Sequence, residues 1–187
     1  MQFDPAKTIR SRPGFSISYG IDPNQEKGLL EWDWVSQRLH KSRNYWIAST
    51  RKNGNPHVAP VWGVYMDEMV YFGTSDSSRK TNNFRHNPNV ALHLESGDET
   101  VIVEGKLELV TDKKILAQIA AAYSAKYPGY NPPPEFDPGT AIYVLLPKTI
   151  LAWTENDFLN TATRWAVIGD DSSEPGNTDF IANNHAS

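Results

Sequence analysis

Four short runs rich in β-branched and aromatic residues lie within residues 45–95, and they constrain the fold more than any other feature. The runs cover residues 45–50, 57–65, 69–74 and 90–95. Asn53-Gly54 separates the first run from the second, and Asp67-Glu68 separates the second from the third. An Asn-Gly pair between two such runs is a strong signal for a tight hairpin turn. This stretch is therefore expected to fold as antiparallel hairpins.

The remainder of the chain extends the same pattern and adds helices. Further strands are expected at residues 100–109, 141–146, 150–154 and 161–167. Apolar residues at helical spacing predict helices over residues 29–41 and 112–127, and a short helix is expected to end at Asn87-Pro88. About six or seven antiparallel strands leave exposed edges unless the sheet closes or forms a sandwich. We therefore predict a mainly β fold, a small β-barrel with flanking helices.

The second run contains two residues that disturb a regular strand. Proline cannot donate a backbone hydrogen bond, so at Pro60 the strand must be an edge, bulged or interrupted. Gly63 marks a second position where another backbone or a ligand can approach closely. A strand of this kind favours a barrel with a gap over a flat sheet.

Length and composition limit the domain organisation and the compartment. The 187 residues are expected to form one domain over residues 29–168, preceded by an arm at 1–28 and followed by a polar tail at 169–187. The absence of cysteine excludes disulfides and thiolate metal sites, and it fits a reducing cytoplasm. The first residues lack the basic and apolar segments of a secretory signal. A cytoplasmic location is therefore expected.

Charge and hydropathy argue against two classes of partner. The net charge is −4, and the only notable basic feature is the local pair Arg79-Lys80. Nucleic-acid-binding proteins usually carry a basic stripe, so no nucleic-acid partner is expected. The longest apolar run, residues 141–146, is too short to cross a bilayer, so no membrane partner is expected either.

The loop that follows the third run is the strongest candidate for a ligand site. It places hydroxyl side chains from Thr74 to Ser78 before Arg79 and Lys80, at the start of the short helix. Exposed amides at a helix start, hydroxyl groups, a guanidinium fork and an ammonium together suit a phosphate. The alternative is a helix capped by Ser77 or Ser78 with two solvated cations.

Other catalytic patterns are weak. The five histidines lack metal-ligand spacing, so no metal site is expected, and His57 and His93 are interpreted as strand residues with local partners. The sequence contains no Gly-x-Ser-x-Gly elbow and no glycine-rich nucleotide-binding loop. The residues alone assign no catalytic side chain.

Three segments together are similar to one known family. They are Pro-His-Val-Ala-Pro-Val-Trp-Gly, Val-Tyr-Phe-Gly-Thr with the following Ser-Arg-Lys, and Asn-Pro-Asn-Val-Ala-Leu-His-Leu-Glu. In order and spacing they resemble the pyridoxamine 5'-phosphate oxidase-like family. The resemblance covers roughly residues 29–165. It implies a split β-barrel that forms a homodimer and holds a flavin or deazaflavin at the subunit interface.

The same resemblance implies positions for the ring and ribityl chain of the cofactor. Pro60, Val61 and Trp62 match the segment that lies along the isoalloxazine ring. Thr74 and Ser75 match the positions beside the ribityl chain.

The phosphate and the second subunit are matched by other residues. Ser78, Arg79 and Lys80 match the phosphate-binding positions, and Asn83 lies near them. The remaining matches, which would reach in from the other subunit, are Trp153 and Arg164.

These observations leave three functions open. The preferred one is an FMN-dependent oxidoreductase acting on an unidentified small molecule, because the compact Ser-Arg-Lys segment suffices for one phosphate. A deazaflavin coenzyme has a longer anionic tail, for which Arg51 and Lys52 are candidate partners unless they form a solvated hairpin tip. The third is a non-catalytic, stress-associated flavin binder. The acidic segment after Trp165 argues against pyridoxamine phosphate itself as the substrate.

Overall fold

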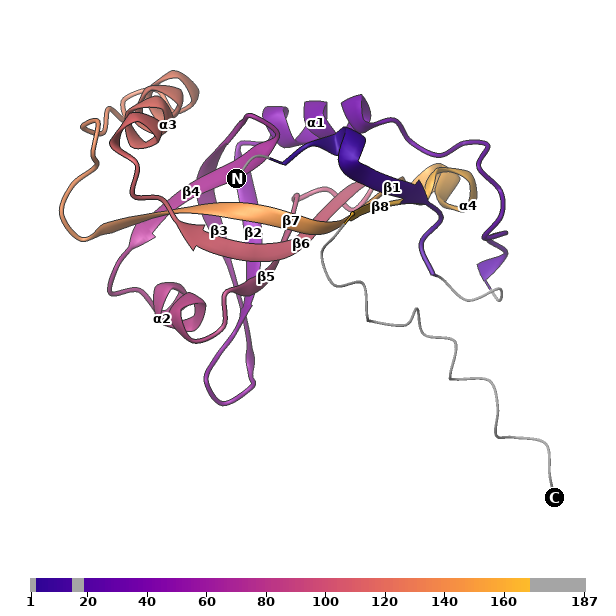
Figure 1. Ribbon diagram of the computed structural model, residues 1–187, viewed down its shortest axis with the longest axis horizontal. Coiled ribbons are helices and arrows are strands. Elements are labelled where there is room, and N and C mark those ends of the chain that lie inside the picture. Colours follow the sequence, from indigo (N-terminus) through magenta and orange to yellow (C-terminus); the bar gives the residue numbers. More distant parts are fainter. Residues whose placement is uncertain (1–2, 15–18, 169–187) are drawn as a thin grey trace.

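A computed structural model describes residues 3–14 and 19–168 of the chain, so the predicted tail at 169–187 lies outside the described residues. Eight antiparallel strands form one sheet in the order β1-β8-β7-β4-β3-β2-β5-β6, and β6 also pairs with β7. That last pairing closes β2 to β7 into a six-stranded barrel, while β1 and β8 extend the sheet beyond it (Figure 1). The predicted mainly β barrel is confirmed.

The strands of the barrel follow the predicted runs closely. Their bounds are β2 Asn44–Thr50, β3 Pro56–Met66, β4 Met69–Ser75, β5 Asn89–His93, β6 Glu99–Leu109 and β7 Thr140–Thr154. Their inward residues are fully buried, with Tyr45, Ile47, Phe72 and Leu92 among the largest. The alternation of buried and partly exposed residues along β2 is the period expected for a strand with one face in the core.

The prediction of separate strands at 141–146 and 150–154 is wrong, because β7 continues through Pro147. Pro147 lies opposite Gly105 on β6, where the register of the two strands shifts between Glu104 and Gly105. A proline is tolerated at such a bulge because the regular ladder is already interrupted there. The bulge lets one long strand serve both the barrel and its extension.

The N-terminal arm contributes a strand of its own. β1, Thr8–Ser11, pairs with β8, Thr163–Val167, which in turn pairs with the second half of β7. Arg12 is buried beside this extension, and its guanidinium donates to the carbonyls of Gln25, Lys27, Asn160 and Ala162. The arm lacks a strong sequence signal because β1 is only four residues long.

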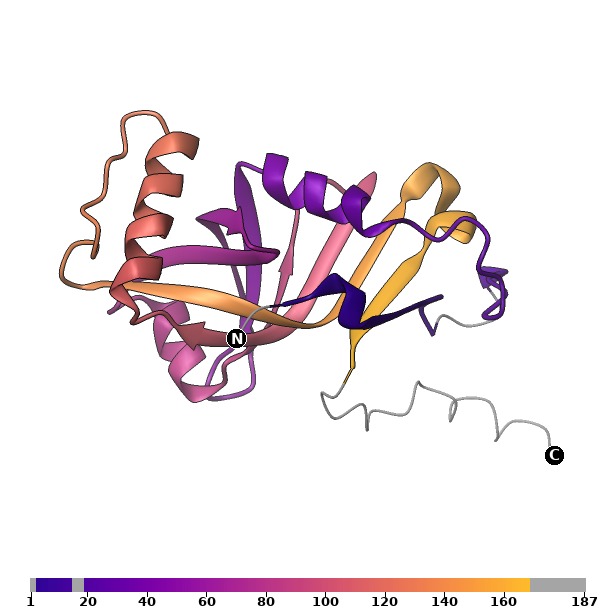
Figure 2. The same cartoon turned by 45° about the horizontal axis from the view of Figure 1, so that its top comes forward.

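Helices cover the barrel at its ends and along one side. Their bounds are α1 Trp32–Lys41, α2 Arg79–His86, α3 Lys113–Lys126 and α4 Phe158–Thr161, with short 3-10 turns at Pro5–Lys7 and Glu155–Asp157. α1 begins three residues later than predicted. α2 and α3 lie at one end of the molecule, and α4 lies with β1 and β8 at the other (Figures 1 and 2).

Candidate functional site

The barrel splits between β3 and β4. The two strands pair only from Gly63 opposite Phe72 to Met66 opposite Met69. Beyond Gly63, β3 keeps β2 as a neighbour, while β4 keeps β7. Pro60 therefore lies where β3 is locally an edge strand, one of the conditions predicted for a proline in this strand.

Gly63 ends the paired part of the two strands at a very close backbone approach. A Cβ atom there would lie 2.7 Å from the carbonyl oxygen of Tyr71 and 3.1 Å from the ring of Tyr45. No larger residue fits without displacing the neighbouring strand. The predicted close approach at Gly63 is thus made by backbone.

A pocket of about 360 Å³ opens at the split. Its lining residues from the two strands are Trp62, Gly73, Thr74 and Ser75. The opposite wall comes from α3, the loop after it and the start of β7, with Tyr123, Tyr130, Phe136, Pro138, Gly139 and Thr140. Among the described residues, the lining holds no carboxylate, and aromatic rings and hydroxyl groups dominate it. This surface suits a flat, polar-edged ligand.

The aromatic wall is internally packed. The ring of Trp62 stacks on Tyr127 with 4.4 Å between centroids and 3° between planes, and Tyr130 meets it edge-on at 5.9 Å. The Arg43 guanidinium lies 5.8 Å from the centre of the same Trp62 ring. Trp62 is nevertheless 45% exposed, so part of its side chain is accessible to a ligand or a second chain.

Hydroxyl groups connect the pocket to the start of α2. Ser78 is the N-cap of that helix, and its Oγ accepts from the backbone amide of Thr81. Oγ1 of Thr74 lies 3.1 Å from Oγ of Ser78, which lies 3.0 Å from Oγ1 of Thr81. Thr81 in turn donates to the carbonyl oxygen of Ser75 at 2.7 Å. The predicted cap at Ser78 is present, and the same hydroxyl belongs to a network that reaches the pocket.

Positive charge converges beside this network. Burial lowers the pKa of His57 on β3, and the charges of Arg51, Arg79 and Lys80 lower it further. None of these three cations forms a salt bridge within the described part of the chain. Nδ1 of His57 and Nε of Arg51 are buried and lack a hydrogen-bond partner. The prediction that His57 is satisfied locally is therefore wrong, whereas Nδ1 of His93 lies 2.7 Å from the carbonyl of Leu94.

Of the remaining residues predicted for the site, Asn83 is bonded within the fold, and Trp153 and Arg164 lie away from the split. The amide of Asn83 is buried and donates to Oγ of Ser49, joining α2 to β2. Trp153 lies near the end of β7, opposite Thr100 of β6. Arg164 lies on β8, opposite Leu151 of β7. The strand from Thr140 to Trp153 spans roughly 40 Å at the usual rise per residue. One chain alone does not bring Trp153 or Arg164 to the split.

Sequence reasoning missed the α3 wall, whereas it did name Arg51 as a candidate partner for an anion. The prediction there was a helix over residues 112–127, with no site role for Tyr123, Tyr127 or Tyr130. Tyr123 and Tyr127 are four residues apart in the predicted helix, a spacing that places their rings on one side and was the available signal. That this side faces the split depends on how α3 packs.

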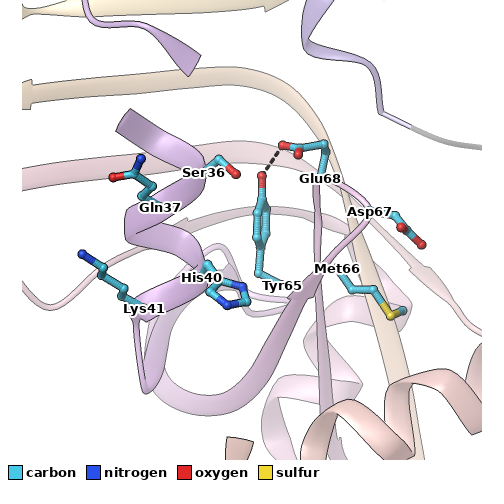
Figure 3. A pocket seen from close by; sticks show the side chains of 8 residues that line it. All are labelled: Ser36, Gln37, His40, Lys41, Tyr65, Met66, Asp67 and Glu68. Carbon is cyan, nitrogen blue, oxygen red and sulfur yellow. Dashed lines mark hydrogen bonds between the residues drawn. The ribbon is translucent and has the colours of Figure 1, made fainter. Parts of the chain in front are cut away.

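A second pocket of about 360 Å³ lies between α1 and the β3–β4 turn (Figure 3). In it the Tyr65 ring points toward Glu68, whose carboxylate accepts from the Tyr65 hydroxyl and from Nε1 of Trp32. Asp67 and Glu68 both adopt positive φ, which the tight turn requires. Because Glu68 is already bonded within the fold, it serves to tie α1 to the turn.

The structure is a six-stranded β-barrel that splits between β3 and β4, with a hydroxyl-rich loop and a cluster of cations beside the gap. The sequence profile of the pyridoxamine 5'-phosphate oxidase family matches residues 33–154, which is well over half of the chain. The chain therefore belongs to the pyridoxamine 5'-phosphate oxidase family, as its motifs suggested. It has no significant match among curated protein sequences.

Solved structures share the fold at low sequence identity. A conserved hypothetical protein from Mycobacterium tuberculosis is 21% identical, with a TM-score of 0.61, and the match covers 70% of this chain and 88% of that one. General Stress Protein 26 from Bacillus anthracis is 22% identical, with a TM-score of 0.53 and coverage of 64% and 91%. A protein described as an F420 reductase is 23% identical, with a TM-score of 0.51 and coverage of 62% and 94%.

Two further features bear on partners and metals. Within residues 3–14 and 19–168, no helix is both long and apolar enough to cross a membrane. The same residues contain no group of three or more histidine or acidic side chains arranged to hold a metal ion.

Proposed function

We propose that this protein is an FMN-binding oxidoreductase that acts on a small molecule. In this proposal the phosphate of FMN binds at the start of α2 and the ring lies in the split between β3 and β4. The family includes oxidoreductases that use flavins or a deazaflavin, which makes this chemistry the natural starting point. The active unit is proposed to be a homodimer.

One observation carries the proposal. Nε of Arg51 and Nδ1 of His57 are buried without partners, beside Arg79 and Lys80, which have no acidic partner in the described residues. Buried polar groups are normally hydrogen-bonded, and leaving one unpaired costs about 1–3 kcal/mol. An anion at this point would pair with these groups, and a phosphate matches both their charge and their donor geometry.

The residues of the chain then have separate roles. Ser78, Arg79 and Lys80 hold the phosphate, and the hydroxyls of Thr74 and Ser75, which line the pocket, accept from or donate to the adjoining polyol chain. Trp62 supplies an apolar wall that orients the ring and excludes water from one of its faces. When bound, the flavin supplies the electron or hydride transfer itself, so the protein contributes orientation, polarity and access.

A deazaflavin coenzyme is the second candidate, because the same anion site, with Arg51 as its third cation, suits that coenzyme as well. Arg51 is half-buried and close enough to His57 to affect its pKa, so it is not a solvated hairpin tip. Lys52, by contrast, is exposed in the turn. The extra cation suits a coenzyme with a longer anionic tail, the class of cofactor named by the F420 reductase neighbour. A non-catalytic flavin binder, in line with the stress-protein neighbour, remains the alternative without turnover.

The first test identifies the cofactor. The purified protein is denatured, and the mass and absorbance of the released small molecule are measured, followed by titration of the cofactor-free protein with FMN and with a deazaflavin. Release or tight binding of FMN supports the proposal. Preference for the deazaflavin establishes the second candidate, and binding of neither contradicts both.

The second test removes the anion clamp. Arg79→Ala with Lys80→Ala is expected to weaken FMN binding about 100-fold or more, since each charge-assisted hydrogen bond contributes about 1.5–3 kcal/mol. Lys7→Ala with Lys114→Ala removes the same charge from exposed positions away from the split and serves as the control. If both double variants bind FMN within a few-fold of the unmodified protein, the phosphate assignment is wrong.

A further inference from the structure

A tyrosine hydroxyl occupies the place of a backbone hydrogen bond in the split. If the pairing of β3 and β4 continued past Gly63 and Phe72, the next pair would be Trp62 and Gly73. Instead, the Tyr123 hydroxyl accepts from the amide of Gly73 at 2.9 Å and donates to the carbonyl of Trp62 at 2.7 Å. The side chain thus satisfies both groups while keeping the strands apart.

The same helix holds the other edge of β3 one residue further on. β2 begins at Asn44, so Gly63 has no β2 partner in the ladder. The Tyr127 hydroxyl accepts from the amide of Gly63 at 2.9 Å and lies 2.6 Å from the carbonyl of Arg43, to which it donates. Nζ of Lys126 donates to the carbonyl of Gly63 at 2.6 Å. α3 is therefore bonded to both sides of β3 at residues 62 and 63.

We infer that Tyr123 and Tyr127 are positioning residues that hold the split open and set the orientation of Trp62. The inference rests on the proposed function, because the split is taken as the site of the cofactor ring. Tyr123 is buried, and its ring lines the pocket. Tyr127 is buried and provides the surface on which Trp62 stacks. Neither residue needs to touch the reacting atoms for this role.

The physical reason is competition between two ways of satisfying the same backbone groups. Without the Tyr123 hydroxyl, the amide of Gly73 and the carbonyl of Trp62 lose their partner in a part of the fold where unpaired groups are unfavourable. Direct pairing of the strands would satisfy both groups with a single hydrogen bond from the amide of Gly73 to the carbonyl of Trp62. That pairing would lengthen the β3–β4 ladder and narrow the pocket at the split, where the cofactor ring is proposed to bind.

Tyr123→Phe tests this because it removes only the hydroxyl and keeps the ring packing. In the cofactor-free full-length protein, NMR is expected to show a new cross-strand contact between the amides of Trp62 and Gly73. Ser124→Ala is the matched control, since it removes a neighbouring hydroxyl that bonds only within α3, to the carbonyl of Ala120. An unchanged Trp62–Gly73 region in Tyr123→Phe overturns the inference.

The consequence for the ligand is measured separately. FMN affinity is expected to fall at least tenfold in Tyr123→Phe, and the visible circular-dichroism band of protein saturated with FMN is expected to change. Tyr127→Phe is expected to alter that band through the loss of Trp62 orientation. A lowered melting temperature with unaltered affinity and an unaltered band would indicate a purely structural role and contradict the inference.

The two proposals fail in different ways. If unmodified protein binds neither FMN nor a deazaflavin, the proposed function fails. The NMR contact between Trp62 and Gly73 still shows, without any ligand, whether the Tyr123 hydroxyl keeps β3 and β4 apart. If unmodified protein binds FMN and Tyr123→Phe binds it equally well, the positioning role fails and the proposed function stands.

Discussion

His57 shows how a single residue reports on the charge around it. Its imidazole is half-buried, and its Nδ1 has no partner. Burial is the main cause of its lowered pKa, and the charges of Arg51, Arg79 and Lys80 act in the same direction. An anion among these three cations would remove part of that repulsion, so binding is expected to raise the pKa of His57 and take up protons.

Acidification is therefore expected to reduce the free energy of unfolding through His57. The unfolded chain binds the proton near the ordinary pKa of 6.5, while the folded chain binds it only at lower pH. This contribution to the free energy of unfolding is fully present above about pH 6.5. It is lost as the pH falls toward the pKa of His57 in the folded chain, by at most about 1.4 kcal/mol per pH unit. Urea denaturation at several pH values between 7.5 and 5 measures the effect.

His57→Gln should flatten this dependence, and His40→Gln, at an exposed histidine, serves as the control. Equal pH dependence in His57→Gln and the unmodified protein would contradict the assignment of the effect to His57.

Lys126 is a second group whose titration should affect stability. It ends α3, and its Nζ donates to the carbonyl of Gly63 on β3. Burial, followed by repulsion from Arg43, lowers the pKa of Lys126 to about 8. Between about pH 8 and 10 the unfolded chain holds more protons than the folded one at this site, so the free energy of unfolding should rise with pH. Lys126→Met is expected to abolish that rise, measured by chemical denaturation at pH 7.5, 8.5 and 9.5. A rise equal to that of the unmodified protein would contradict it.

At the scale of elements, the β6–β7 bulge allows the long strand β7 to pair with β4 and β6 in the barrel and with β8 beyond it. Gly105 lies so close to β7 that an added Cβ would be 2.1 Å from the carbonyl oxygen of Leu146. Backbone on both sides fixes this spacing, and no flexible side chain can move aside. The glycine is therefore required by the approach of the two strands.

Gly105→Ala is expected to reduce the free energy of unfolding by about 1–3 kcal/mol, the usual cost of overpacking a tight site. Gly97→Ala is the matched control, because an added Cβ there meets nothing within 4 Å. Urea denaturation of both variants measures the difference. Comparable stability of the two variants would show that β6 and β7 separate easily at the bulge.

At the scale of the whole molecule, the proposed function places residues of a second chain at the site. Trp153 and Arg164 are separated from the split by most of the length of β7. The outer face of β3 also exposes apolar side chains, with Val58 at 50% and Trp62 at 45%. A symmetric dimer would cover such a face and bring distant residues of the partner to each split.

Complementation between inactive variants tests this arrangement. Arg79→Ala with Lys80→Ala and Trp153→Ala with Arg164→Ala are each expected to bind FMN poorly as homodimers. Unfolding and refolding an equal mixture should restore roughly a quarter of the original sites, since each mixed dimer contains one intact site. Sedimentation velocity confirms the dimer, and a failure to restore binding in mixed dimers would place both residue sets in one subunit or outside the site.

Much of the fold was predictable because its signals are local. Alternation and β-branched residues located β2 to β6, α3 begins after Asp112 within the predicted range of 112–127, and Ser78 caps α2. The errors arose where tertiary contacts override local preference. β7 passes through Pro147 because β6 bulges opposite it, and the four-residue β1 exists because β8 offers an edge.

The sequence by itself determined the strands from β2 to β6, the cap of α2 and the family, since hairpin turns, helix caps and motif spacing depend on neighbours along the chain. Only the tertiary structure decided that β3 and β4 separate beyond Gly63, and that two tyrosines of α3 satisfy the backbone there. It alone showed that Arg51 and His57 stand beside Arg79 and Lys80. These features depend on contacts between residues far apart in the chain, which no local pattern encodes.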